Sequence, residues 1–297
     1  MVHHLENCLV TIFTPTYNRA SLLPRLYNSL LRQSKKDFFW LIVDDGSTDN
    51  TSSLVDGWLK EGKIDIRYIF QENAGKMKAH NRGVCECHTE LFMCLDSDDY
   101  LSDDCIEKIY MHWGDYKDNP KVSGMVAYRK MIGRTPFFFP EVKFSTLHDL
   151  HRTYIGETAL AFRTAILRQF PFPEIEGEKF IGEGIVYEKL DQRFVLAVIP
   201  EYWMICEYQD GGYTDNSLRT LINNPCGWAL NAKQKYEIYG HGVRNRIKWM
   251  STYICASLFA NYGLAYIVCT SPNRVLCVMC LPIGWMQKIR NQKRVGK

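Results

Sequence analysis

The stretch "LVTIFTPTYNRASLLPRLYNSLLRQ" (residues 9–33) sets a pattern that the next hundred residues repeat. Its first six residues are apolar or β-branched, as expected of a short buried strand. In the remainder, Leu22, Leu26 and Leu30 recur at the spacing of one helix face. A strand followed at once by a helix is typical of the units that build parallel sheets. The stretch therefore favours an α/β fold.

The same order of strand and helix continues to about residue 130. Further strands are expected within residues 38–47, 66–71, 90–95 and 122–128, and helices within residues 48–60, 75–87 and 103–116. Alternation at this spacing predicts a mostly parallel sheet with helices on both faces. In such sheets ligands bind beyond the carboxyl ends of the strands.

A polar motif follows each of the first four predicted strands: "TPTYNR", "DDGSTD", "ENAGK" and "DSDD". The four motifs are therefore expected to meet at one rim of the sheet. "DSDD" (residues 96–99) crowds three carboxylates together, and a divalent cation would relieve their repulsion. Hard oxygen ligands suit Mg²⁺ or Mn²⁺, which usually complete their shells with substrate phosphates. A solvated turn is the alternative, but the position at the rim favours a site for a nucleotide diphosphate.

Other phosphate-binding motifs are absent from the sequence. No Gly stands five residues before Gly75, and Met77 replaces the Ser or Thr of a Walker loop. No G-x-G-x-x-G follows the first predicted strand, so a dinucleotide-binding domain is unsupported. The remaining possibility is a site that binds a nucleotide through a metal ion, without a glycine-rich phosphate-binding loop.

Composition narrows the class of protein further. The 297 residues carry a formal net charge of +3 and are 46% hydrophobic, which indicates a globular protein and no nucleic-acid partner. The eleven cysteines lie in apolar contexts and are expected to be reduced thiols rather than disulfides or zinc ligands. The opening "MVHHLENCLVT" lacks the apolar run of a signal peptide, so we expect a cytoplasmic location.

Four segments carry a resemblance to a known family: "VTIFTPTYNRASLLPRLYNSLLRQ", "WLIVDDGSTDNT", "NAGKMKAHNRG" and "FMCLDSDDYL". In this order and spacing, over roughly residues 8–130, they resemble the amino-terminal half of the inverting family 2 glycosyltransferases. The later half is similar, more loosely, to bacterial members that assemble polysaccharides and glycolipids. The resemblance implies the GT-A fold, a Rossmann-like, mostly parallel sheet flanked by helices, here with a C-terminal helical appendage.

The resemblance also implies a donor site at the predicted rim. Thr14, Pro15 and Tyr17 would wrap the nucleotide base. Asp45 would accept a hydrogen bond from the uracil imide, because a carboxylate suits a ring N–H donor. Lys76 would face the diphosphate, although a solvated helix start is the alternative for this residue.

For the acidic motif, the resemblance implies a site for Mn²⁺ or Mg²⁺ as cofactor. Asp98 would ligate the ion directly, and Asp96 would lie near the ribose and contribute to the same site. Asp99 would either orient its neighbours or cap the following helix.

Inverting transfer further requires a base that deprotonates the acceptor hydroxyl. Family members take it from an Asp or Glu that begins a helix in the second half of the chain. Glu183 in "FIGEGIVYEKL" is the best match, although Gly184 stands where an Asp is expected. A Glu at a helix start is also favoured by the helix dipole alone. Glu178 and Asp191 are the reserve candidates.

We expect a GT-A domain over residues 1–230, with a nucleotide-sugar half (1–130) and an acceptor half (131–230), and a C-terminal helical region over residues 231–297. Residues 249–273 carry no charge, yet their Asn, Ser and Thr make them too polar for a good membrane span. A buried or interfacial helix is expected there instead.

Three later segments complete the predictions. Residues 193–208 are expected to form two strands broken at Pro200. The loop at 207–216 would be a flap over the donor, an acceptor contact or a plain surface loop. The basic tail "KIRNQKRVGK" (288–297) follows apolar helices, which suits peripheral attachment to the anionic inner face of the cytoplasmic membrane. A solubilising tail is the alternative.

Together these features predict a metal-dependent inverting glycosyltransferase. It would move a sugar from a nucleotide-sugar, preferably a UDP-sugar, to a hydroxyl of a saccharide or lipid-linked saccharide in cell-surface polysaccharide assembly. The alternative is a catalytically silent homologue that binds nucleotide or acts as a scaffold in a membrane-associated complex. The sequence determines neither the sugar, the linkage, the acceptor nor the oligomeric state.

Overall fold

The computed structural model describes residues 8–133, 135–207 and 216–296. The chain divides into two compact units: the sheet unit (Met1–Pro171 and Val186–Gln209) and the helical unit (Phe172–Ile185 and Asp210–Lys297). The helical unit thus starts earlier than the boundary expected at residue 231. It does so because the helices just before and across residue 231 pack on the helices that follow them.

In the described part of the chain, the sheet unit contains one sheet in the order β3-β2-β1-β4-β8-β6-β9-β5, with β7 paired to β9. Its strands are β1 (Val10–Thr16), β2 (Phe38–Asp44), β3 (Ile66–Phe70), β4 (Leu91–Cys94), β5 (Asp99–Leu101), β6 (Val122–Met131), β7 (Phe144–Ser145), β8 (Thr158–Arg163) and β9 (Val195–Cys206). The first four strands run parallel, and β6 is parallel to β9. β8 is antiparallel to both its neighbours, and β5 is antiparallel to β9. The predicted α/β fold with a mostly parallel sheet is confirmed.

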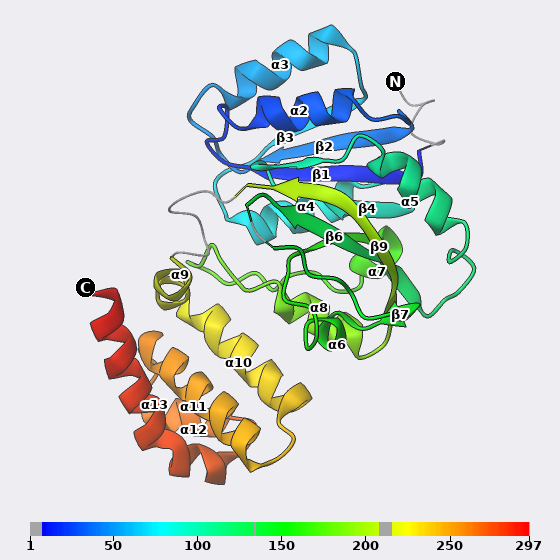
Figure 1. Ribbon diagram of the computed structural model, residues 1–297. Helices are drawn as coiled ribbons and strands as arrows, with labels where there is room; N and C mark the ends of the chain where they lie inside the picture. The colour runs from blue at the N-terminus through cyan, green and yellow to red at the C-terminus, as the bar shows by residue number, and fades with distance from the viewer. Residues whose placement is uncertain (1–7, 134, 208–215, 297) are drawn as a thin grey trace. The chain divides into compact units, whose positions relative to one another are not determined.

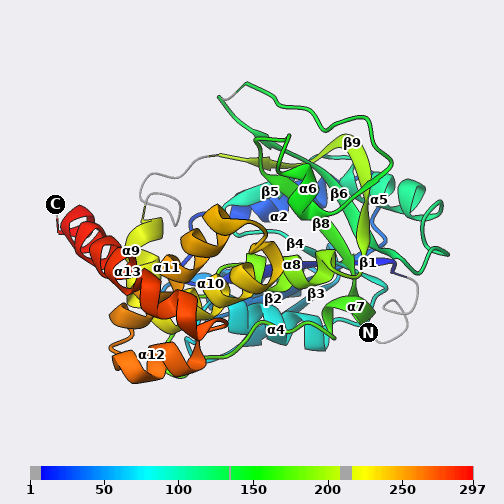
Figure 2. The same cartoon turned by 90° about the horizontal axis from the view of Figure 1, so that it is seen from below.

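Helices cover both faces of this sheet (Figure 1 and Figure 2). Those of the sheet unit are α2 (Leu23–Leu31), α3 (Thr51–Glu61), α4 (Lys76–Glu86), α5 (Cys105–Trp113), α6 (Leu147–Leu150) and α7 (Thr164–Leu167). α2, α3 and α5 share one core with Val10 and Ile12 of β1. Phe13, the next residue after Ile12, points to the opposite face, where its ring meets His80 of α4 edge-on at 5.6 Å. Successive side chains of β1 point to opposite faces of the sheet. Because both faces are covered, the sequence of β1 is a continuous apolar run.

One strand differs from its prediction. β9 is continuous through Pro200, where we expected a break between two strands. The pairing of β6 with β9 shifts there, from Val126 opposite Val198 to Tyr128 opposite Tyr202. Pro200 therefore lies at a bulge, where its missing N–H costs no ladder hydrogen bond.

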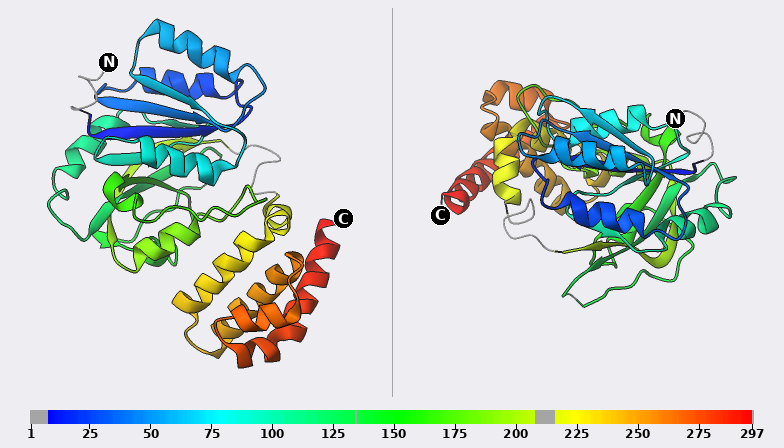
Figure 3. Two further views of the ribbon diagram at one scale, coloured as in Figure 1. Left: turned by 180° about the vertical axis from the view of Figure 1, so that it is seen from behind. Right: turned by 90° about the horizontal axis from the view of Figure 1, so that it is seen from above.

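The helical unit consists of α9 (Ser217–Asn223), α10 (Pro225–Tyr239), α11 (Val243–Phe259), α12 (Leu264–Thr270) and α13 (Arg274–Val295), preceded by residues 172–185. α11 packs against both α10 and α13, as Figure 3 shows. The approach of α13 is close, because a Cβ at Gly284 would lie 2.5 Å from a side-chain carbon of Ile254. α8 (Gly184–Asp191) leads the chain back into the sheet unit.

The uncharged segment 249–273 contributes to the core of this unit. Met250, Ile254 and Leu258 of α11 are buried, as expected of an internal helix. Among the described helices, we find none that combines the length and the apolarity required to cross a bilayer.

Gly83 tests the packing of α4 on the sheet. A Cβ there would lie 2.4 Å from the ring of Phe13, which is fully buried and cannot swing aside. We expect Gly83→Ala to lower the free energy of unfolding by about 1–3 kcal/mol through overpacking. Gly57→Ala is the matched control, because nothing lies within 4 Å of its Cβ position. The control should gain about 0.5–1 kcal/mol from helix propensity. Equal urea midpoints for the two variants would contradict this account.

Candidate active site

Three carboxylates gather at the carboxyl end of β4. Asp96 and Asp98 lie in the turn after the strand, and Asp99 begins β5. One carboxylate oxygen from each of the three lies within 4.8 Å of those of the other two. Three hard oxygen donors at this spacing fit Mg²⁺ or Mn²⁺. The cluster is thus a candidate site for a divalent cation.

Two cations face the cluster from different elements. Lys76, the first residue of α4, places its Nζ 2.8 Å from Oδ1 of Asp96. Arg129 of β6 forms an ion pair with the buried Asp99 and lies 3.9 Å from Oδ2 of Asp96. Its other terminal nitrogen lies 2.8 Å from a carboxylate oxygen of Glu157. The positive charge of these two side chains partly compensates the three aspartates.

The surroundings shift the pKa values of the aspartates in opposite directions. Burial opposes ionisation of Asp96, but the charges of Lys76 and Arg129 outweigh it and lower its pKa. Burial raises the pKa of Asp99 to about 8, although Arg129 acts against this shift. The Asp98 carboxylate is partly exposed, and no hydrogen bond to it is found among the described residues. Asp98 is therefore the member of the cluster best placed to take an added ligand.

Arg25 of α2 holds the turn that carries these aspartates. Its guanidinium donates to the backbone carbonyl of Asp98 and pairs with Glu207. It also lies over the ring of Tyr100, 4.9 Å from the ring centroid. Glu207 begins the loop expected at 207–216, of which residues 208–215 lie outside the described part of the chain.

Asp45 is buried and organises the loop between β3 and α4. Its carboxylate accepts hydrogen bonds from the side chains of Gln71 and Asn73 and from the backbone N–H groups of Ala74 and Gly75. Gly75 has φ +99°, a conformation that favours glycine. Four donors use most of the acceptor capacity of a carboxylate. The structure thus gives Asp45 loop partners in place of the open acceptor that we expected for the uracil imide.

The three residues expected to wrap the base differ in exposure. Thr14 is fully buried, and its hydroxyl accepts a hydrogen bond of 3.0 Å from Nε1 of Trp40. Pro15 is buried in β1 as well. Tyr17 is 48% exposed at the rim. Of the three, Tyr17 therefore has the side chain available for a base.

The three candidates for the base have different surroundings. Asp191 accepts hydrogen bonds from the backbone N–H groups of Leu147 and His148 at the start of α6, and burial raises its pKa. Glu178 accepts two hydrogen bonds from backbone N–H groups in the first turn of α10, at 2.6 and 2.7 Å. Glu183 is exposed and directly precedes α8, as predicted. Glu178 and Glu183 belong to the helical unit, whereas Asp191 and the acidic cluster belong to the sheet unit.

Sequence reasoning missed Arg129 and Glu157. The signal for Arg129 is a charged residue inside an apolar strand, in "VSGMVAYRKM". A buried charge is costly unless it is paired, so its presence indicates an acidic partner. Nothing in the local sequence marks Glu157, which contacts Arg129 through long-range pairing of β6 with β8.

Comparison with known proteins finds related sequences. The sequence profile described as "Glycosyl transferase family 2" matches residues 11–174. "Glycosyltransferase GlyG" of Streptococcus pneumoniae serotype 4 is 31% identical over 131 residues, which are 44% of this chain and 43% of that protein. The chain thus spans less than half of this curated relative.

Solved structures are similar over nearly the whole chain. TarS 1–349 of S. aureus in complex with UDP-GlcNAc has a TM-score of 0.59 at 17% identity, covering 95% of this chain and 88% of that one. The mannosyltransferase PcManGT of Pyrobaculum calidifontis, in complex with GDP-Man and Mn²⁺, has a TM-score of 0.54 at 17% identity, covering 96% and 82%. At this identity the likeness shows the fold alone.

The loop-organising role of Asp45 leads to a stability prediction. Asp45→Asn replaces one acceptor oxygen by an NH₂ group, which leaves buried loop N–H groups without a partner. We expect the free energy of unfolding to fall by about 1.5–3 kcal/mol, as for hydrogen bonds to a charged group. Asp56→Asn, on the exposed face of α3, is the control and should stay within about 0.5 kcal/mol of the parent chain. Urea titration measures the free energy of unfolding of both variants. An Asp45→Asn variant as stable as the parent chain would refute the loop-organising role of Asp45.

Proposed function

Since this chain belongs to glycosyl transferase family 2, we propose that it transfers a sugar from a nucleotide-sugar, preferably a UDP-sugar, to a hydroxyl of a saccharide or lipid-linked saccharide. The setting would be the assembly of a cell-surface polysaccharide. The observation that carries this proposal is the acidic cluster of Asp96, Asp98 and Asp99 at the carboxyl end of parallel strands. TarS is in complex with UDP-GlcNAc and PcManGT with GDP-Man, which supports a nucleotide-sugar donor, and the UDP preference is part of the proposal.

Asp98 and Asp96 would hold Mn²⁺ or Mg²⁺, which would supply charge stabilisation for the departing diphosphate. Lys76 lies beside Asp96 at the amino-terminal end of α4, so its ammonium adds positive charge on the side where phosphate oxygens would bind.

Arg129 orients Asp99 and prevents it from turning away from its neighbours. Tyr17 would stack on the base from the exposed rim.

For the inverting displacement we propose Glu183 as the general base. Glu178 and Asp191 each satisfy backbone N–H groups at the start of a helix, which favours a structural role for both. Glu183 is exposed ahead of α8 and is thus accessible to an acceptor hydroxyl. Deprotonation of that hydroxyl contributes about 10²–10⁴-fold to the rate in such reactions.

Substitution of the proposed residues tests the reaction. Asp98→Ala should lower Mn²⁺-dependent hydrolysis or transfer of a UDP-sugar by at least about 10²-fold, because the leaving diphosphate loses its charge stabilisation. Glu183→Gln should lower transfer by a similar factor while UDP-sugar binding persists. Asp118→Ala, at an exposed turn after α5, is the control. Donor binding by the parent chain without turnover on any acceptor would instead support the catalytically silent alternative.

We also propose that the helical unit binds the surface of an anionic membrane. α13 is apolar on both sides: Cys277, Cys280 and Gly284 face the core of the unit, and a second row is exposed. The exposed apolar residues of this helix are Val275, Val278, Met279, Ile283, Trp285, Met286 and Ile289. Exposed basic residues, among them Arg274, Arg290, Lys293 and Arg294, flank them. An apolar row beside basic residues suits an interfacial helix on anionic lipids.

Vesicle sedimentation tests this surface. The parent chain should sediment with anionic vesicles at low salt, and Met279→Glu should weaken this at least about tenfold, since a buried Met is worth about 1.5–3 kcal/mol. Met111→Glu is the control, because Met111 is a similarly exposed methionine on α5 of the sheet unit. Equal recovery of the parent chain in the supernatant with and without vesicles would exclude the interaction.

A further inference from the structure

We propose that a cavity within the helical unit is the binding site for the acceptor saccharide, an inference that rests on the proposed function. The cavity has a volume of about 300 Å³ and is formed by residues 180–182 together with α9, α10 and α11. All of its lining residues belong to the helical unit. Its volume falls at the lower end of the range of about 300–1,000 Å³ that is usual for small-ligand sites.

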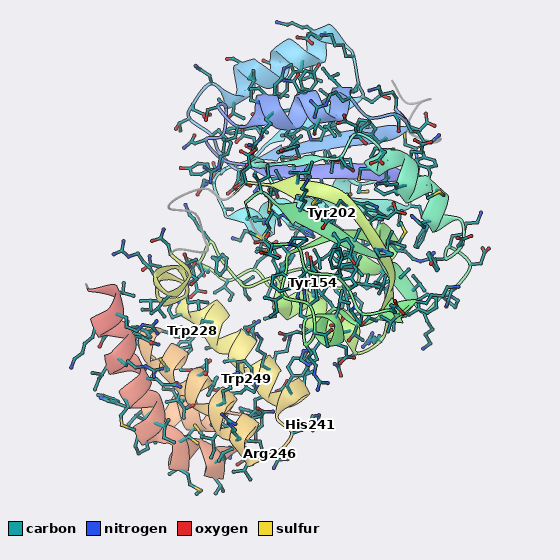
Figure 4. All side chains as sticks on the ribbon, in the orientation of Figure 1. Tyr154, Tyr202, Trp228, His241, Arg246 and Trp249 are labelled. Carbon is teal, nitrogen blue, oxygen red and sulfur yellow. The ribbon has the colours of Figure 1, made fainter. Side chains whose placement is uncertain are left out.

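Two tryptophans form its aromatic surface. Trp228 of α10 and Trp249 of α11 both line the cavity, and Figure 4 shows their positions on the two helices. Trp228 is held by stacking on Phe259, with ring centroids 6.0 Å apart. The faces of indole rings carry negative charge density and attract the C–H groups that cover one side of a sugar ring. A pyranose therefore suits this surface, and on Trp249 it would compete with the ammonium groups of Lys235 and Lys248 that lie over that ring.

The polar side chains of the cavity separate a saccharide from an acyl chain. Thr220 and Asn231 line the cavity from α9 and α10, and Thr252 lines it from α11. Sugar hydroxyl groups can exchange hydrogen bonds with these hydroxyl and amide groups. A hydrocarbon chain would offer no hydrogen bond to the Thr220 hydroxyl or the Asn231 amide, which costs about 1–3 kcal/mol for each group. The Thr252 hydroxyl already donates to the backbone carbonyl of Lys248 and does not discriminate between the two ligands. The lining thus favours a polyol.

Charge adds a preference within the class of saccharides. Among the described residues that line the cavity, Lys235 is the charged one, and no carboxylate is present. Its Nζ lies 5.1 Å from the centroid of the Trp249 ring, and Lys248 lies 4.4 Å from the same centroid on α11. Two ammonium groups beside one wall favour a saccharide that carries a phosphate or carboxylate group.

One residue that lines the cavity also adjoins the proposed base in the sequence. Gly182 lines it, and Glu183, the proposed base, is the next residue. Because both belong to the helical unit, the acceptor site and the base would be parts of the same compact unit. The residues proposed to hold the donor belong to the sheet unit.

The test follows the indole N–H signals of the ¹⁵N-labelled full chain by NMR, assigned through Trp228→Phe and Trp249→Phe. The probes are glucose 6-phosphate, glucose and octanoate. Glucose 6-phosphate should shift the signals of both tryptophans, glucose should do so more weakly, and octanoate should leave them in place. Asn231→Ala and Trp249→Ala should each weaken the binding of glucose 6-phosphate about tenfold, equivalent to about 1.4 kcal/mol.

Leu230→Ala is the control, because Leu230 is exposed on the same helix and does not line the cavity. Absence of any shift with both sugars, or a shift with octanoate alone, overturns the proposal. Hydrolysis of UDP-sugar by the parent chain distinguishes a failure of the acceptor site from a failure of the proposed function. If the donor is hydrolysed and the sugars do not bind, only the acceptor site fails. If sugars bind and the donor is not turned over, the proposed function fails, and with it the assignment of the bound sugar as an acceptor.

Discussion

Charge compensation at the carboxyl end of β4 is the constraint on which the candidate site depends. Three neighbouring carboxylates cannot all ionise at this spacing unless positive charge lies close to them. Lys76 provides it from α4, which packs on β1 and β2, and Arg129 provides it from β6, which lies beyond β4 on the other side of the sheet order. The cluster can therefore form only when the parallel strands and the antiparallel insertion of β8 are both in register. Fold and site are coupled through these ion pairs.

The parallel half of the sheet could be predicted because its signals are local. Each strand and the helix after it carry their own periodicity, and each polar motif stands directly after its strand. The convergence of Lys76 with Asp96 follows from this order, since α4 begins after the short loop that follows β3, and Asp96 follows β4. The family resemblance rests on the same four segments and is confirmed by the match over residues 11–174.

The remaining features depend on contacts between distant segments, which local periodicity does not encode. β1 is buried on both faces, so no alternation reveals that Thr14 faces Trp40 rather than the rim. Arg129 meets Asp99 only because β6 and β5 both pair with β9. The cavity of the helical unit arises where Phe180 and Gly182 meet α10 and α11, some forty to seventy residues further along the chain. In each case the role of a residue depends on a partner from a distant segment of the chain, which the residue's own sequence context does not reveal.

The hydrogen bonds of Asp45 have a consequence for how a nucleotide is received. The loop of residues 71–75 is already ordered by that carboxylate before any nucleotide binds. Immobilising a mobile side chain at a binding site costs about 0.5–1.5 kcal/mol, and prior ordering avoids this loss of entropy. A nucleotide that docked against this loop would meet residues that are already ordered, without a rearrangement of residues 71–75.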